Sequence, residues 1–159
     1  MKKDHFFSAN PQKSANKVTI NSIMMGSLFF ILTLIITLDP LKFHIWVIYQ
    51  LVLAIPLLFV SSLAYSKIGY KNNIYSWDVF GWFTNTLGNL FVMNAVGLVA
   101  SKFSLSLGYF YFVLLMGLML VYTIINVRTT SLSKFSKIFK LLFLLAVVYI
   151  GGLRILLAL

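Results

Sequence analysis

The sequence lacks cysteine and glutamate, and only 10% of its 159 residues are charged. Without cysteine the chain has no disulfides, no thiolate nucleophile and no zinc–thiolate or iron–sulfur site. Its acidic residues are three aspartates, Asp4, Asp39 and Asp78. Carboxylate pairs for acid–base catalysis or metal binding are therefore hard to build, and we expect no cofactor and no metal centre.

The shortage of charge also excludes a soluble domain, which typically keeps about a quarter of its residues charged. Here 60% of the residues are hydrophobic and the mean hydropathy is +0.95. A disordered chain is excluded as well, because low hydrophobicity is what keeps such chains open. The composition indicates an integral membrane protein.

Five long apolar runs support this interpretation, because a helix needs roughly 20 apolar residues to cross a bilayer. The expected fold is all-α, an integral membrane helical bundle with five transmembrane helices. A polar, basic tail over 1–18 precedes a single transmembrane domain over 19–159. The expected helices cover about 19–38, 44–66, 79–101, 104–127 and 138–158. The fifth spans fully only if Arg154 snorkels to the headgroups; a re-entrant helix is the alternative.

The net charge of +10 follows the positive-inside rule, since Lys and Arg are enriched in cytoplasmic segments. With the N-terminus inside, only Lys42, Lys102 and Arg154 fall on the outer side. We expect a multi-pass protein of the plasma membrane or bacterial inner membrane, with its N-terminus cytoplasmic and its C-terminus outside. Nucleic acid is not an expected partner, because no basic face with exposed aromatic platforms lies outside the apolar runs.

A basic amphipathic segment precedes the fifth run. Lys134, Lys137 and Lys140 recur at i, i+3 and i+6, which suits a helix lying along an anionic leaflet. These three lysines are candidate contacts for anionic lipids at the cytoplasmic face. The alternative is a topology anchor whose lysines snorkel.

A polar stripe runs along the third expected helix. At 100° per residue Asp78, Asn85 and Asn89 share one face, and Asn94 lies opposite. Amides in hydrocarbon are costly unless they find partners, and polar groups in spanning helices usually face the bundle interior or a water-filled cavity. One reading is a hydrophilic path or site with Asp78 at its cytoplasmic mouth.

The other reading of the stripe is helix–helix packing, in which the amides bond a neighbouring helix and Gly81 and Gly88 permit close approach. Both readings place the stripe inside the protein. We expect apolar residues such as Phe29 and Leu57 to face the lipid instead.

No enzyme signature such as G-x-S-x-G, H-E-x-x-H or a P-loop occurs in the sequence, which favours a non-enzymatic role. The first functional hypothesis is a permease, channel or transporter subunit that acts as a homo-oligomer on a small solute or ion. The alternative is a non-catalytic membrane scaffold or accessory protein that binds lipid or a larger complex.

Overall fold

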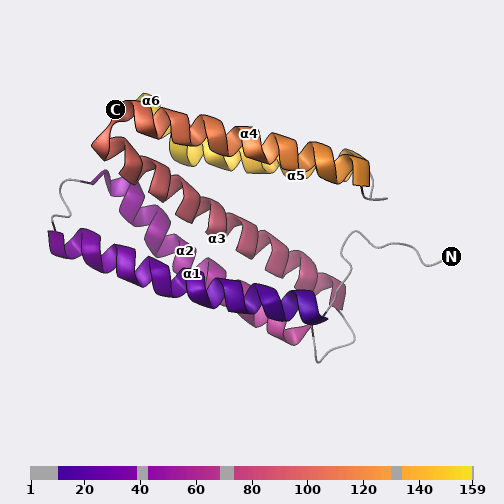
Figure 1. Cartoon of the computed structure of the whole chain (residues 1–159). Coiled ribbons are helices and arrows are strands. Elements are labelled where there is room, and N and C mark those ends of the chain that lie inside the picture. Colours follow the sequence, from indigo (N-terminus) through magenta and orange to yellow (C-terminus); the bar gives the residue numbers. More distant parts are fainter. Residues whose placement is uncertain (1–10, 39–42, 69–73, 130–133, 159) are drawn as a thin grey trace. The chain divides into compact units, whose positions relative to one another are not determined.

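The computed structural model describes residues 11–38, 43–68, 74–129 and 134–158. Within these ranges the chain is helical and contains no strand. The elements are α1 (Pro11–Leu38), α2 (Ile45–Lys67), α3 (Ile74–Phe103), α4 (Leu105–Thr129), α5 (Lys134–Val148), a π-helical turn (Tyr149–Leu153) and α6 (Arg154–Leu157) (Figure 1). Among the described residues, five helices are long and apolar enough to cross a membrane, which confirms the predicted all-α class and the five long apolar helices.

Three helices begin earlier than the apolar runs indicated. α1 starts at Pro11, α3 at Ile74 and α5 at Lys134, because a helix can extend beyond its apolar run. Proline is well tolerated in the first turn of a helix, where its missing N–H has no intrahelical acceptor. The extension of α1 places Lys17 on the helix rather than in a tail.

The fifth predicted run is helical without a break from Lys134 to Leu157, and Lys137–Leu157 is long enough to span a membrane. The described residues show no re-entrant turn here. A wide π turn takes in the glycine pair at residues 151 and 152. Arg154, which follows this turn, is exposed.

Outward-facing hydroxyl groups are satisfied within their own helices, as a lipid environment requires. On α1, Ser22, Ser27 and Thr33 each donate to the carbonyl four residues earlier, at 3.0, 3.1 and 2.8 Å. Phe29 beside them is 57% exposed. The lipid-facing assignment of Leu57 is wrong, because this residue is half-buried and its Cβ lies against Gly88 of α3.

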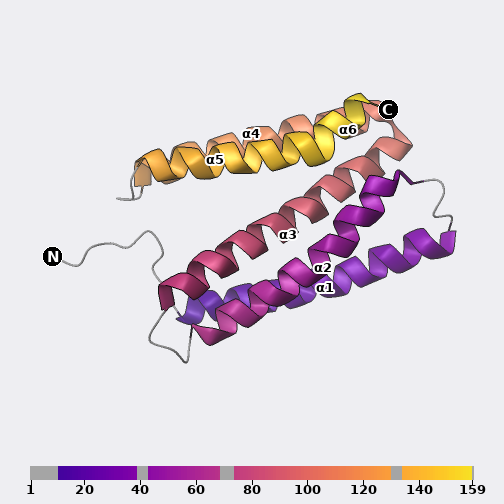
Figure 2. The same ribbon diagram turned by 180° about the vertical axis from the view of Figure 1, so that it is seen from behind.

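The chain divides into two compact units, and α3 is split between them at Val92 and Met93. The N-terminal unit, Phe7–Val92, contains α1, α2 and the first part of α3. α1 and α2 lie side by side (Figures 1 and 2). α2 begins at a side-chain cap in which His44 Nδ1 accepts from the backbone N–H of Trp46 at 3.3 Å.

α2 and α3 approach closely at two glycines. A Cβ on Gly81 would lie 3.1 Å from the Tyr65 ring, and a Cβ on Gly88 would lie 3.0 Å from the Leu58 side chain. Both glycines are buried. The missing side chains set the distance between the two helices, as small residues do at membrane helix contacts.

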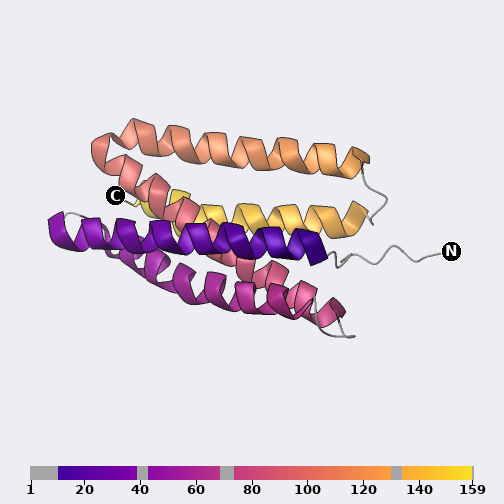
Figure 3. The same ribbon diagram turned by 60° about the horizontal axis from the view of Figure 1, so that its bottom comes forward.

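The C-terminal unit, Met93–Leu159, contains the end of α3, α4, α5, the π turn and α6. α4 and α5 run alongside each other (Figure 3). Phe112 of α4 is fully buried. A Cβ on Gly97 would lie 2.6 Å from its ring, and a Cβ on Gly152 would overlap the ring. Phe112 therefore fills a notch formed by two glycines.

Candidate functional site

A chain of hydrogen bonds joins the three helices of the N-terminal unit. Asn21 of α1 donates through Nδ2 to Ser61 Oγ of α2 at 3.3 Å and to the Leu58 carbonyl at 3.5 Å. Ser61 Oγ donates in turn to the Gly81 carbonyl of α3 at 3.0 Å. Asn21 and Ser61 are both fully buried. We call Asn21, Ser61 and the Gly81 carbonyl the polar chain.

A second contact joins α1 and α2 one helical turn away. Lys17 donates through Nζ to Tyr65 Oη at 2.7 Å and lies 4.1 Å from the centre of that ring. Lys17 precedes Asn21 by four residues and Tyr65 follows Ser61 by four, so each pair lies on one face of its helix. Antiparallel packing then makes the two contacts neighbours.

Asp78 lies at the start of the same part of α3. Its side chain is only 8% exposed. Within the described part of the chain, no hydrogen bond or ion pair involves its carboxylate. The Tyr65 phenol is within electrostatic reach of this carboxylate. The side chain of Asp78 is thus largely enclosed by protein, although its carboxylate oxygens are not among the fully buried atoms that lack a partner.

The two asparagines of the α3 stripe contact each other. Asn89 donates through Nδ2 to the backbone carbonyl of Asn85 at 2.9 Å, and both residues are half-buried. Asn85 Oδ1 is buried without a hydrogen-bond donor, and so is Asn21 Oδ1. Asn21 on α1 and Asn85 on α3 therefore share this feature.

Two buried hydroxyl groups of this unit donate to backbone carbonyls. Ser61 donates to the Gly81 carbonyl. Thr84 is buried and donates to the carbonyls of Phe80 and Gly81, at 2.9 and 3.3 Å. The N-terminal unit is thus left with a surplus of acceptor oxygens, which suits a positively charged or hydrogen-bond-donating ligand.

Of the predicted stripe, the structure places Asp78, Asn85 and Asn89 on one helix, and the Asn89 side chain donates to the backbone carbonyl of Asn85. The sequence interpretation missed Asn21 and Ser61, which complete the polar chain from two other helices. Their only signal was that each is a polar residue inside an apolar run.

Asn94, predicted to lie opposite the stripe, is fully buried and belongs to the C-terminal unit. Its Nδ2 donates to the backbone carbonyl of Val147 on α5 at 3.1 Å, while its Oδ1 has no donor. This bond joins α3 to α5 and is typical of helix packing in membranes.

The basic segment is only partly described. Lys137 is buried, and its Nζ donates to the Asn126 and Val127 carbonyls at 2.9 and 3.5 Å. These carbonyls belong to the end of α4, where a helix lacks its own donors and a cation is stabilised. Lys140 is half-buried, and the side chain of Lys134 lies outside the described residues. The lipid contact stays a prediction, and Lys140 is its better-placed member.

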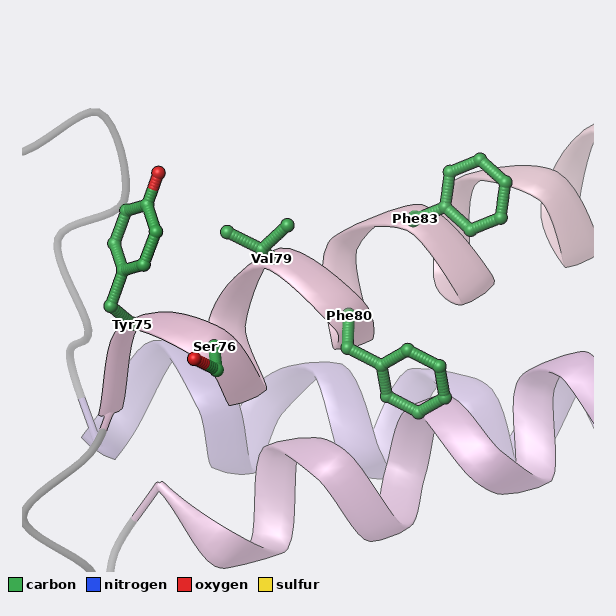
Figure 4. A pocket seen from close by; sticks show the side chains of 5 residues that line it. All are labelled: Tyr75, Ser76, Val79, Phe80 and Phe83. Atoms are coloured by element: carbon green, nitrogen blue, oxygen red, sulfur yellow. The ribbon is translucent and has the colours of Figure 1, made fainter.

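A shallow hollow lies elsewhere on α3 and is lined by Tyr75, Ser76, Val79, Phe80 and Phe83 (Figure 4). All of its lining residues come from one helix and most are apolar. Neither Asp78 nor Asn85 lines it. This hollow suits a lipid chain better than a polar ligand, so we place the candidate site at the polar chain.

No known family matches this sequence, and no curated protein or solved structure is significantly similar to it. Among the described residues, no three His or Asp side chains gather as a metal centre. The chemistry of the polar chain is therefore the basis for assigning a function.

Proposed function

We propose that the protein is a permease, channel or transporter subunit of a membrane, with its route along the polar residues of α1, α2 and α3. The observation that supports this is the surplus of buried acceptors in the N-terminal unit. Asn21 Oδ1 and Asn85 Oδ1 have no donor, and Asp78 is buried without a described partner.

Packing alone does not require the acidic side chain of Asp78, whereas an amide oxygen without a donor also occurs at Asn94, where the side chain joins two helices. Buried polar groups normally find hydrogen-bond partners, and ionisable residues inside membranes usually mark ion or substrate pathways. The groups also extend toward the middle of the bilayer. At 1.5 Å per residue, Asn85 lies about 10 Å and Asn89 about 16 Å along the axis from Asp78, toward the depth where transport sites are commonly found.

The charge distribution gives this proposal a direction. With the N-terminus cytoplasmic and the C-terminus outside, Asp78 lies at the cytoplasmic end of the route, in a plasma membrane or bacterial inner membrane. A homo-oligomer is part of the proposal, because a single small chain has few helices to line a transport pathway. Lys140 then lies where anionic lipids of the inner leaflet would meet it.

The alternative, a scaffold or accessory protein, is favoured by different observations. Gly81 and Gly88 bring α2 and α3 into close contact, and the Asn94–Val147 bond joins α3 to α5. If packing were the whole purpose of the polar residues, their surroundings would be dry. Access of water to Asn85 therefore discriminates between the two functions.

The natural absence of cysteine allows a direct test. Single cysteines are placed at Asn85, on the route, and at Phe29, on the exposed apolar face of α1. In native membranes the Asn85→Cys protein should react with a charged, water-soluble thiol reagent, and the Phe29→Cys protein should not. Reaction at neither position would favour the scaffold.

Flux is the second measurement. Purified protein in vesicles should pass at least one member of a panel of small ions and solutes faster than empty vesicles do. Asp78→Asn should change that flux while the protein stays folded, because the substitution preserves size and removes charge. The matched control is Thr33→Val, which removes an exposed hydroxyl from α1. A panel without any flux would refute transport.

A further inference from the structure

We infer that the π turn at Tyr149–Leu153 is a register switch, in which α6 rotates by about 100° between one register that buries Leu156 and another that buries Ile155. This inference is independent of the proposed transport function, because all of its residues belong to the C-terminal unit.

α5 has one buried face, and its residues follow the period of a regular α-helix. Lys137 and Val148 are both buried. They lie eleven residues apart, which corresponds to three turns and a phase difference of about 20°. Leu142 and Ala146 are exposed and lie about 120° and 160° from Val148. The direction of the buried face is therefore well defined where α5 ends.

Beyond the π turn, a regular α-helix would bury a different residue from the one that is buried. Ile155 follows Val148 by seven residues, so it would lie about 20° from Val148, and Leu156 would lie about 80° from it. In the structure Leu156 is 1% exposed, whereas Ile155 is half-buried and Arg154 is exposed. The burial pattern after the turn is thus displaced by one residue.

The π turn accounts for this displacement, because its hydrogen bonds close over five residues instead of four. The backbone N–H of Arg154 donates to the carbonyl of Tyr149. With one residue absorbed in this way, Leu156 takes the place of the seventh residue after Val148 and lies within about 20° of it. Arg154 then lies about 140° from Val148, among the exposed positions of the helix.

Contacts with neighbouring helices hold both sides of the turn. Asn94 of α3 donates to the Val147 carbonyl, directly before the turn, at 3.1 Å. Beyond the turn, a Cβ on Gly108 of α4 would lie 3.3 Å from Leu156 Cδ2. Because α5 is fixed before the turn, a change of register has to occur within the turn and move the residues that follow it.

The sequence supplies equivalent residues for the second register. Ile155 and Leu156 are adjacent isomers, and exchanging one for the other conserves the buried volume. Gly151 and Gly152 are adjacent as well, so a shift by one residue brings no Cβ into the notch that the Phe112 ring fills. Glycine also adopts new backbone angles more readily than other residues. Both registers are therefore compatible with the same neighbours.

Arg154 is the charged group that the switch moves. When the π turn reverts to a regular α-helix, Ile155 replaces Leu156 on the buried face and Arg154 travels about 100° around the helix axis. π turns within α-helices frequently mark functional sites. Helix register shifts take microseconds to milliseconds, which makes them accessible to nuclear magnetic resonance.

The first test is deletion of Ile150, which lies in the turn and is 58% exposed. Val148 and Leu156 then lie seven residues apart, so a regular α-helix keeps both on the buried face. The melting temperature in micelles should equal or exceed that of the full chain. The matched control is deletion of Leu142, which is 59% exposed in the regular part of α5. This control should lower the melting temperature by about 10 °C or more, because it rotates one end of α5 out of register.

The second test observes the two registers directly. The chain has no cysteine, so Arg154→Cys carries a single fluorine label. In lipid nanodiscs the label should give two exchanging ¹⁹F resonances in the full chain and one after deletion of Ile150. Ile155→Asn should remove the second resonance, because that register would bury an amide, and the control Ile155→Val should retain it.

Equal losses of stability from the two deletions would overturn the inference, since the turn would then not hold an extra residue. A single resonance in the full chain would overturn it as well, and so would two resonances that persist after deletion of Ile150. If Arg154→Cys does not fold, a label at the exposed Leu157, introduced as Leu157→Cys, gives the same readout.

Discussion

The helices that belong wholly to one unit are about equally apolar in the two units, and yet the interiors of the units differ. The spans of α1 and α2 have mean hydropathies of 2.0 and 2.2, and those of α4 and α5 have 2.2 and 2.1. In the N-terminal unit a polar chain links α1, α2 and α3. In the C-terminal unit the Phe112 ring fills a notch of two glycines. Average hydropathy therefore reveals that a helix is apolar enough to cross a membrane, but it does not reveal which contacts hold the helices of a unit together.

The comparison predicts how each unit responds to substitution. An interior held by the fit of a rigid ring tolerates no added volume, because close-packed cores respond to a single carbon atom. An interior held by polar contacts loses little stability per bond in a membrane, but it loses its ligand chemistry. Substitutions in the C-terminal unit should therefore affect stability most, and substitutions in the N-terminal unit should affect function most.

The largest effect is expected for Gly152→Ala, because the added Cβ overlaps a fully buried Phe112 ring that Gly97 confines from α3. We expect the free energy of unfolding to fall by about 2–3 kcal/mol, measured by denaturant or thermal unfolding in micelles. Gly117→Ala is the control, since nothing lies within 4 Å of its new Cβ. Equal stability of the two variants would contradict the notch.

Lys137→Met should have the next largest effect. The substitution removes a buried ammonium group that donates to two carbonyls at the end of α4. Since hydrogen bonds to charged groups contribute about 1.5–3 kcal/mol, we expect a loss near the lower end of that range in the same unfolding assay. Lys102→Met, at an exposed position in the last turn of α3, should change stability far less. A loss shared by both variants would point to a general effect of charge.

Gly88→Ala should cost less than Gly152→Ala, although it also adds a Cβ at a close helix contact. The atoms that the Cβ meets belong to the Leu58 side chain at 3.0 Å, and an aliphatic chain shifts more easily than a confined ring. We expect about 1 kcal/mol of lost unfolding free energy, with Gly26→Ala as the control because its Cβ meets nothing within 4 Å. A loss as large as that of Gly152→Ala would show that the two interiors are equally rigid.

The smallest effect is expected for Ser61→Ala, which removes the middle of the polar chain. Side-chain hydrogen bonds in membrane proteins average about 0.6 kcal/mol, so unfolding should change only slightly. Ser27→Ala, whose exposed hydroxyl bonds its own helix, is the matched control. A loss above that of Lys137→Met would mean that the polar chain is the main support of the N-terminal unit.

Much of the fold could be predicted from the sequence, because run length and hydropathy are local properties. The five helices and the shared face of Asn85 and Asn89 follow from helix geometry alone. The lipid-facing position predicted for Leu57 failed because it depends on a neighbour from another helix. Its apolar character fits a lipid face and a helix contact equally well, and only its neighbour Gly88 distinguishes them.

The candidate site could be predicted only in the part that lies on α3. Lys17 and Asn21 on α1, and Ser61 and Tyr65 on α2, each show the four-residue spacing of one helix face. Nothing in that spacing indicates that the two faces meet. The meeting depends on antiparallel packing and on the rotation of each helix about its own axis.

The sequence by itself determined that this chain is helical, with runs long and apolar enough to cross a membrane, and which of its residues would be costly to expose to hydrocarbon. Only the tertiary structure decided that Asn21 donates to Ser61, that Ser61 reaches the Gly81 carbonyl, and that Asn21 Oδ1 and Asn85 Oδ1 remain without donors. The physical reason is that helix period fixes neighbours within one helix. Neighbours between helices are fixed by where small residues allow close contact.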